Sequence, residues 1–293
     1  MKSKEIIALI TFVAICIGLY YWRNHRYKII SNYAPQELVY KTIKDKHIKL
    51  DVYRPDDTLQ RYKTILYFHG GSWLAGTKLK VLEHYRNYVL KSLLERDIQI
   101  ISVDYTLITP WKYHLEDCIK DCQQAVEYCL ENAGYLRIDT SSVGLWGSSA
   151  GGHLAMINYA QCFNNKQIKF IIDDFGPADI HVMWKMVTKF FRRQVSSIFF
   201  DIKTRNVQKF DSLAREYSPI YYIDQLKTVP MLISHGSNDR IVKPSQSQQL
   251  HDSLPNSSEF YFYQGLRHGF KTMDSAEIKA YNERLQVFVA TNF

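Results

Sequence analysis

The chain has 293 residues, of which 46% are hydrophobic and 14% aromatic, and a formal net charge of +8 at pH 7. This length allows one sizeable core of helices and strands, alone or with a short appendage. Because the Lys and Arg residues are spread along the chain and no nucleic-acid-binding motif occurs, we expect a basic surface and no nucleic-acid partner, with attraction to anionic lipid as the second interpretation.

An uncharged apolar run lies near the start of the chain, from Ile6 to Trp22, with cations on both sides. As a helix it would be roughly 25 Å long, slightly short of a ~30 Å hydrocarbon core, with Tyr20, Tyr21 and Trp22 at the interface. No small-x-small cleavage site follows, which favours an anchor over residues 1–28 rather than a cleaved signal peptide. We therefore expect a single-pass membrane protein. The flanking cations nearly balance, so they give no orientation.

Strands and helices alternate from residue 38 onward. The apolar and turn patterns predict strands at 39–43, 47–53, 64–68, 98–103, 143–146, 169–173, 229–234 and 259–263. They predict helices near 81–95, 115–132, 150–162, 245–254 and 275–290. Strands that are continuous apolar runs separated by helices are typical of a parallel sheet covered on both faces. We therefore expect one α/β domain over residues 38–293.

The alternation lapses between residues 179 and 220, where the chain becomes helix-leaning and rich in aromatic and cationic residues. One interpretation is a cap or lid over a functional site. The other is an ordinary helical insertion that packs its aromatic side chains against the core.

Five cysteines occur along the chain, and they lack both metal-ligand spacing and the density of a disulfide scaffold. They are Cys16, Cys118, Cys122, Cys129 and Cys162. The middle three recur at intervals of four and seven residues, which predicts the buried face of one helix. We therefore expect reduced thiols and no metal site.

The segment 143–153, Val-Gly-Leu-Trp-Gly-Ser-Ser-Ala-Gly-Gly-His, is an apolar strand that breaks into small residues around Ser149. Gly147 and Gly151 stand two residues on either side, which is the G-x-S-x-G spacing of a nucleophile elbow. Glycine is required there because the entering strand and departing helix pass close together. The helix N-terminus favours developing negative charge. Ser149 is therefore the candidate nucleophile, and a simple Gly/Ser turn is the alternative.

A serine nucleophile needs a base to accept its proton and an acid to orient that base. Asp239 lies in a turn after the strand at 229–234, and His268 lies in a glycine-flanked loop after the strand at 259–263. Both should project from the carboxyl edge of the sheet, where the elbow also lies. The order Ser149, Asp239, His268 is the α/β-hydrolase order of nucleophile, acid and base.

Other residues compete for two of these roles. Asp174 follows the strand at 169–173 and is the rival acid, but a glycine and a proline bracket the turn that presents Asp239. For the base, His251 falls on a predicted helix and His235 lies at a strand end with an unknown side-chain direction. We therefore expect Asp239 and His268 to act with Ser149.

A glycine-rich turn follows the strand at 64–68, with the sequence His-Gly-Gly-Ser-Trp at 69–73. Glycines let backbone N–H groups approach a substrate oxygen, and the residue after the nucleophile supplies a further N–H. We expect an oxyanion hole formed by the N–H groups of Gly71, Ser72 and Ala150, with Gly70 shaping the turn.

Together these motifs resemble the esterase/lipase branch of the α/β-hydrolase superfamily. The matching segments are Tyr-Phe-His-Gly-Gly-Ser-Trp at 67–73, Asp-Tyr at 104–105, Gly-Ser-Ser-Ala-Gly-Gly-His-Leu at 147–154, His-Gly-Ser-Asn-Asp at 235–239 and Arg-His-Gly-Phe at 267–270. The resemblance covers about residue 38 to the end. It implies a mostly parallel eight-stranded sheet with helices on both faces, and hydrolysis of carboxylic esters through an acyl-serine without a cofactor.

The acetyl-esterase, hormone-sensitive-lipase-like and arylformamidase groups of this superfamily are the most similar. The hormone-sensitive-lipase-like group has a third glycine where this chain has Ser72, and Asp-Tyr-Arg-Leu-Ala-Pro where this chain has Asp-Tyr-Thr-Leu-Ile-Thr-Pro at 104–110. The H-G-G-x-W form suits the other two groups.

We therefore predict a serine hydrolase of carboxylesterase type that acts on small-molecule esters of short or medium acyl chains. An amidase or arylformamidase on the same three residues is one alternative. A catalytically silent hydrolase fold used for recognition is the other.

Overall fold

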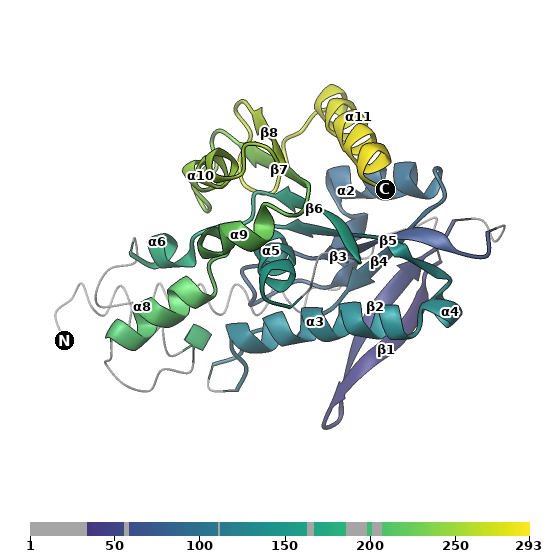
Figure 1. The fold of residues 1–293 in the computed structure, drawn as a ribbon, viewed down its shortest axis with the longest axis horizontal. Helices are drawn as coiled ribbons and strands as arrows, with labels where there is room; N and C mark the ends of the chain where they lie inside the picture. Colours follow the sequence, from purple (N-terminus) through teal and green to yellow (C-terminus); the bar gives the residue numbers. More distant parts are fainter. Residues whose placement is uncertain (1–33, 56–58, 111, 163–166, 186–197, 201–206) are drawn as a thin grey trace.

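In the part of the chain that the structure describes, eight strands form one sheet in the order β1-β2-β4-β3-β5-β6-β7-β8 (Figure 1). The structure is a computed structural model that describes residues 34–55, 59–110, 112–162, 167–185, 198–200 and 207–293. The strands are β1 (Gln36–Ile43), β2 (Lys46–Tyr53), β3 (Tyr62–Phe68), β4 (Ile98–Val103), β5 (Ile138–Ser148), β6 (Ile168–Asp174), β7 (Met231–Gly236) and β8 (Ser258–Tyr263).

The sheet is mostly parallel, as the sequence predicted. A tight turn joins β1 to β2, and β2 runs antiparallel to both β1 and β4. From β4 to β8 every neighbouring pair of strands is parallel. The carboxyl ends of β3, β5, β6, β7 and β8 therefore meet along one edge, which is the edge where the candidate site was expected.

Helices cover both faces of the sheet (Figure 1). They are η1 (Lys78–Leu82), α2 (His84–Leu94), α3 (Leu115–Glu131), α4 (Ala133–Leu136), α5 (Ala150–Cys162), α6 (Ile180–Lys185), α8 (Val207–Glu216), η2 (Pro219–Tyr222), α9 (Ile223–Leu226), α10 (Ser245–Ser253) and α11 (Ser275–Asn292). On one face α2 and α11 bury side chains such as Leu90 and Leu285. On the other, α3 and α5 bury side chains such as Val126 and Leu154. Each face thus has its own hydrophobic core.

Helix α3 confirms the predicted cysteine face. Cys118, Cys122 and Cys129 are all free and buried within the core beside α5. Cys162, at the end of α5, is also a free thiol. Cys16 lies outside the described residues.

The helix predicted near 81–95 is divided in two. The 3₁₀ turn η1 ends at Leu82, and α2 begins at His84, whose φ of 50° lies in the left-handed region. Left-handed backbone interrupts a right-handed helix. The break redirects the chain between Lys80 and Arg86, and both side chains are buried nonetheless.

Asp174, the rival candidate acid, connects the sheet to the helices of one face. Its buried carboxylate accepts hydrogen bonds from Trp146 Nε1 at 2.8 Å, from Tyr85 Oη at 2.9 Å and from Tyr281 Oη at 2.7 Å. Burial raises the pKa of this carboxyl despite the three donors, which lower it. Asp174 therefore ties β6 to β5, α2 and α11.

The predicted single-pass membrane localisation is contradicted. Among the described residues, no helix has both the length and the apolar character needed to cross a bilayer. Helix α11 is 18 residues long, but Glu277, Lys279, Glu283 and Arg284 lie along it. The anchor predicted over residues 1–28 lies outside the described residues.

The aromatic side chains of the 179–220 segment are buried together where the structure describes them. Trp184 lies with its ring centroid 4.7 Å from that of Phe199, and Phe200 stacks on Tyr217 at 5.9 Å. Phe199 also contacts Trp73, in the glycine-rich turn, at 5.9 Å. Residues 186–197 and 201–206 of the predicted cap lie outside the described residues.

Candidate active site

Ser149 stands at a sharp turn between β5 and α5. Its φ of 56° lies in the left-handed region, which is unfavourable for a residue with a side chain. Two backbone hydrogen bonds hold it there. Ser149 N donates to Asp174 O at 2.8 Å, and His153 N donates to Ser149 O at 3.1 Å in the first turn of α5. The neighbouring strand and the helix thus over-determine the strained turn.

The glycines flanking Ser149 are required by close packing. A Cβ built on Gly147 would lie 2.1 Å from Gly151 O, and one built on Gly151 would lie 1.9 Å from Phe68 O. Both contacts are with backbone atoms, so no side-chain rotation relieves them. The G-x-S-x-G spacing therefore reflects how tightly α5 passes β5 and β3.

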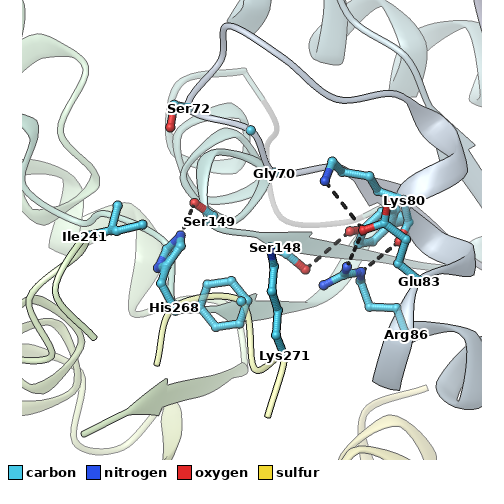
Figure 2. Close-up of a pocket in the computed structure, with 14 residues that line it drawn as sticks. Gly70, Ser72, Lys80, Glu83, Arg86, Ser148, Ser149, Ile241, His268 and Lys271 are labelled. Atoms are coloured by element: carbon cyan, nitrogen blue, oxygen red, sulfur yellow. Dashed lines mark hydrogen bonds and ion pairs between the residues drawn. The ribbon is translucent and has the colours of Figure 1, made fainter. Parts of the chain in front are cut away.

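The three residues predicted to act together are joined by hydrogen bonds, and Figure 2 shows the one between His268 and Ser149. His268 Nε2 lies 2.8 Å from Ser149 Oγ, and His268 Nδ1 lies 2.6 Å from Asp239 Oδ2. An ionised Asp239 only accepts hydrogen bonds, so Nδ1 carries the proton and Nε2 is left to accept from the serine hydroxyl. The loops after β5, β7 and β8 bring these side chains to one edge of the sheet.

Asp239 is held as an ionised acceptor. Its side chain is fully buried, and its Oδ1 accepts hydrogen bonds from the backbone N–H groups of Ile241 at 2.8 Å and Val242 at 3.0 Å. His235 Nε2 lies 3.2 Å from Oδ2. Burial by itself would raise the pKa of this carboxyl, but the hydrogen bonds from His235 and His268 lower it overall. The carboxylate therefore stays charged beside His268.

The rival histidines are engaged elsewhere. His235 is buried behind the acid, with Nδ1 at 2.7 Å from Ser247 Oγ. His251 Nδ1 lies 2.8 Å from Ser258 Oγ. Of these three histidines, His268 is the one within hydrogen-bonding distance of Ser149 Oγ.

The glycine-rich turn after β3 has an unusual backbone. Gly71, Ser72 and Trp73 have positive φ values of 137°, 54° and 59°. The carbonyl of Gly71 accepts hydrogen bonds from the N–H groups of Leu74 at 3.1 Å and Ala75 at 3.0 Å. Only glycine fits at position 71, since a Cβ there would lie 1.9 Å from Ala75 O.

This turn lies directly against the nucleophile. A Cβ built on Gly70 would be 3.2 Å from Ser149 Cβ and 2.7 Å from Ser148 O. Gly70, Gly71 and Ser72 line the same pocket as Ser149. Ala150 is the first residue of α5, so its N–H belongs to the helix end that lacks intrahelical acceptors. The four residues predicted for the oxyanion hole are therefore gathered around Ser149.

His69 supports this turn, a role that the sequence analysis did not assign. Its Nδ1 lies 3.0 Å from Gly70 O, and its ring stacks on Tyr105 with centroids 4.2 Å apart. Tyr105 Oη in turn donates to His69 O at 2.7 Å. Burial lowers the pKa of His69 to about 3, so the ring is neutral at pH 7. The tyrosine of the Asp-Tyr motif at 104–105 therefore holds His69, and through it the glycine-rich turn, in place.

A pocket of about 310 Å³ opens at Ser149. Near Ser149 it is lined by His268, Ile241 and the glycine-rich turn (Figure 2). Its other wall is formed by Lys80, Glu83, Arg86 and Lys271. These four side chains belong to no motif. They come from η1, its junction with α2, α2 itself and the loop after β8, so no local pattern in the sequence indicates them.

Solved structures with the same architecture include an esterase. A thermophilic esterase of Thermogutta terrifontis, solved with propionate bound, matches with a TM-score of 0.70 at 20% identity over 88% of this chain and 94% of that chain. At that identity the match shows the fold alone, which is the α/β-hydrolase fold.

Relatives that match most of this chain include a methylesterase and an arylesterase. An isoprenylcysteine alpha-carbonyl methylesterase of Arabidopsis thaliana is 24% identical over 234 residues, which are 75% of this chain and 53% of that protein. An arylesterase of Saccharolobus solfataricus is 26% identical over 260 residues, which are 84% of this chain and 78% of that protein. This chain therefore spans about half the length of the first relative.

The family model BD-FAE matches residues 50–254, which is more than half of the chain. The chain therefore belongs to the BD-FAE family, among the esterases of the α/β-hydrolase superfamily. The superfamily and esterase branch recognised from the motifs are thus confirmed.

The close packing at the elbow gives a test of stability. Gly151→Ala should lower the free energy of unfolding by about 3 kcal/mol or more, because the new methyl forces α5 away from β3. Gly134→Ala is the matched control, since a Cβ there meets nothing within 4 Å. It should be neutral or slightly stabilising. Equal denaturation midpoints for the two variants would contradict the packing described.

Two buried neutral histidines predict a loss of stability in acid. Burial lowers the pKa of His69 to about 3 and of His153 to about 4, against about 6.5 in the unfolded chain. Their contribution to the free energy of unfolding is complete above pH 6.5. It is lost as the pH falls towards their pKa values in the folded chain, because only the unfolded chain then binds these protons. From pH 7 to 5 each should remove about 1–2 kcal/mol from the free energy of unfolding.

Replacing one of these histidines isolates its share. His153 Nε2 donates to Tyr217 O at 2.6 Å, a hydrogen bond that a glutamine amide can imitate. His153→Gln should flatten the dependence of the unfolding free energy on pH between 7 and 5, whereas His47→Gln, at an exposed position, should leave it unchanged. An identical slope in wild type and His153→Gln would refute a neutral buried His153.

Proposed function

We propose that this chain hydrolyses small carboxylic esters through a covalent acyl-serine intermediate, with Ser149 as the nucleophile. The observation that carries the proposal is the unbroken line of hydrogen bonds from Asp239 through His268 to Ser149. The esterase names of the relatives agree with it. Three catalytic side chains within bonding distance also argue against a catalytically silent fold.

The proposed reaction begins with Ser149 Oγ attacking the ester carbonyl carbon while His268 Nε2 accepts the hydroxyl proton. The carbonyl oxygen becomes an oxyanion, which the N–H groups of Gly71, Ser72 and Ala150 stabilise. His268 then gives the proton to the departing alcohol, and the C–O bond to the alcohol breaks. A water molecule repeats the sequence on the acyl-serine and releases the acid. Asp239 stabilises the imidazolium in both halves.

The pocket supports a limit on substrate size. Its volume of about 310 Å³ is at the low end for small-molecule sites, so esters of short or medium acyl chains fit the proposal. The contact between Trp73 in the glycine-rich turn and Phe199 in the 179–220 segment supports a role for that segment as a cap next to the oxyanion hole. Residues 38–293 would then act as one catalytic domain.

Replacing the nucleophile tests the mechanism. Ser149→Ala should lower kcat/KM for p-nitrophenyl butyrate by a factor on the order of 10⁴ or more, since only the oxyanion donors and binding remain. Ser253→Ala, at an exposed position on α10, should keep the wild-type rate. A Ser149→Ala variant with near-normal turnover would eliminate the proposed chemistry.

The same preparations distinguish an esterase from an amidase. Hydrolysis of an N-formyl aryl amide should be much slower than hydrolysis of the aryl ester, and both should depend on Ser149. A higher kcat/KM for the amide would show that amides, and not esters, are the preferred substrate class. The proposed roles of the three catalytic residues would be unaffected.

A further inference from the structure

The pocket wall formed by Lys80, Glu83, Arg86 and Lys271 is strongly basic. Three cationic side chains line it, those of Lys80, Arg86 and Lys271, and Glu83 is the one carboxylate among the described lining residues. In Figure 2 Lys80 and Arg86 point into the pocket from the side opposite Ile241, and Lys271 lies between His268 and Arg86. The same pocket holds the nucleophile, so a substrate that reaches Ser149 also meets this positive charge.

Glu83 cannot neutralise this wall by itself. A single oxygen, Oε2, lies 3.3 Å from Arg86 Nη2 and 3.5 Å from Lys80 Nζ. Its other oxygen, Oε1, is buried without a hydrogen-bond partner. One carboxylate oxygen of Glu83 is therefore shared by two cations, and both N–O distances are longer than those of a good charged hydrogen bond.

Two of the cations are largely removed from water. Lys80 is 8% exposed and Arg86 is 6% exposed, so water screens both charges only weakly. Burial, together with the positive charges of Arg86 and Lys271, lowers the pKa of Lys80 against the opposing effect of Glu83. Lys80 therefore lies within electrostatic reach of both Arg86 and Lys271.

Asp174 is the other acidic group near Arg86, and its position differs from that of Glu83. Its carboxylate is bonded to Trp146, Tyr85 and Tyr281, within the α2 and α11 face, and it does not line the pocket. Burial raises the pKa of this carboxyl, while Arg86 and the three hydrogen-bond donors lower it. The excess of positive charge therefore remains at the pocket surface.

We infer that this wall binds a free carboxylate on the substrate, so that the enzyme prefers half-esters of small dicarboxylic acids or esters of small carboxylate-bearing alcohols. The inference rests on the proposed ester hydrolysis at Ser149 and names its substrate class. A carboxylate is complementary to a lining in which cations outnumber carboxylates, and the limited pocket volume requires that it stand only a few bonds from the ester. The positive wall would also attract such substrates by long-range electrostatics.

Matched pairs of esters test this inference and locate the carboxylate. For the acyl side, mono-p-nitrophenyl glutarate is compared with p-nitrophenyl butyrate. For the alcohol side, 4-acetoxybenzoate is compared with its methyl ester. In one pair the charged ester should have a kcat/KM at least about tenfold above the neutral one, and 0.5 M salt should reduce that ratio because it screens the attraction.

Lys271 provides the variant because it is exposed and its replacement leaves the core untouched. Lys271→Gln should reduce the ratio of charged to neutral kcat/KM by about three- to tenfold, the effect of one partly screened ion pair. Lys279→Gln removes an equal charge from the exposed surface of α11, outside the pocket, and should leave the ratio and the neutral rate unchanged. Arg86→Gln, checked first for an intact thermal transition, should reduce the ratio further.

Each result has a distinct meaning. A preference for either charged ester that falls in Lys271→Gln and Arg86→Gln supports the inference and assigns the wall to the acyl or the alcohol side. Neutral esters hydrolysed as well as charged ones in both pairs, or a preference that both variants retain, would overturn it while leaving ester hydrolysis intact. If wild type cleaves none of the four esters, the proposed function fails first and the inference fails with it.

Discussion

The site depends on one interaction, the hydrogen bond from the imidazole of His268 to a buried, ionised Asp239. That bond fixes which ring nitrogen carries the proton and turns the other towards Ser149. It exists because backbone N–H groups and a second histidine keep the carboxylate charged in spite of burial. If the carboxyl were neutral, the imidazole would lose both its orientation and the partner that stabilises its charged form.

The fold meets this requirement by bringing together residues that are far apart in the chain. The parallel strands β5, β7 and β8 end at the same edge, so Ser149, Asp239 and His268 meet there although 119 residues separate the first from the last. The same edge holds the glycine-rich turn, which His69 and Tyr105 brace from behind. Strain at Ser149 is tolerated because hydrogen bonds to strand β6 and within helix α5 fix its backbone.

The sequence could predict the parts of this arrangement that leave a local pattern. The glycine spacing around Ser149 reflects a steric constraint, and apolar runs indicate the central strands. The eight strands and their order along the chain could therefore be predicted. Strand β5 was predicted only from residue 143, because its first residues, Ile138 to Ser142, are mostly polar. The basic wall escaped prediction because Lys80, Arg86 and Lys271 are adjacent only after folding. The membrane localisation inferred from the apolar run at 6–22 is contradicted, because no helix of the described residues is long and apolar enough to cross a bilayer.

Covalent labelling tests the central claim most directly. A fluorophosphonate added to the full chain should react once, and peptide mass spectrometry should place the adduct on Ser149. His268→Ala should abolish labelling at pH 7 while retaining a cooperative unfolding transition, because the serine hydroxyl then has no base. An adduct on another residue, or undiminished labelling of Ser149 in His268→Ala, would contradict an account in which Asp239 and His268 activate this serine.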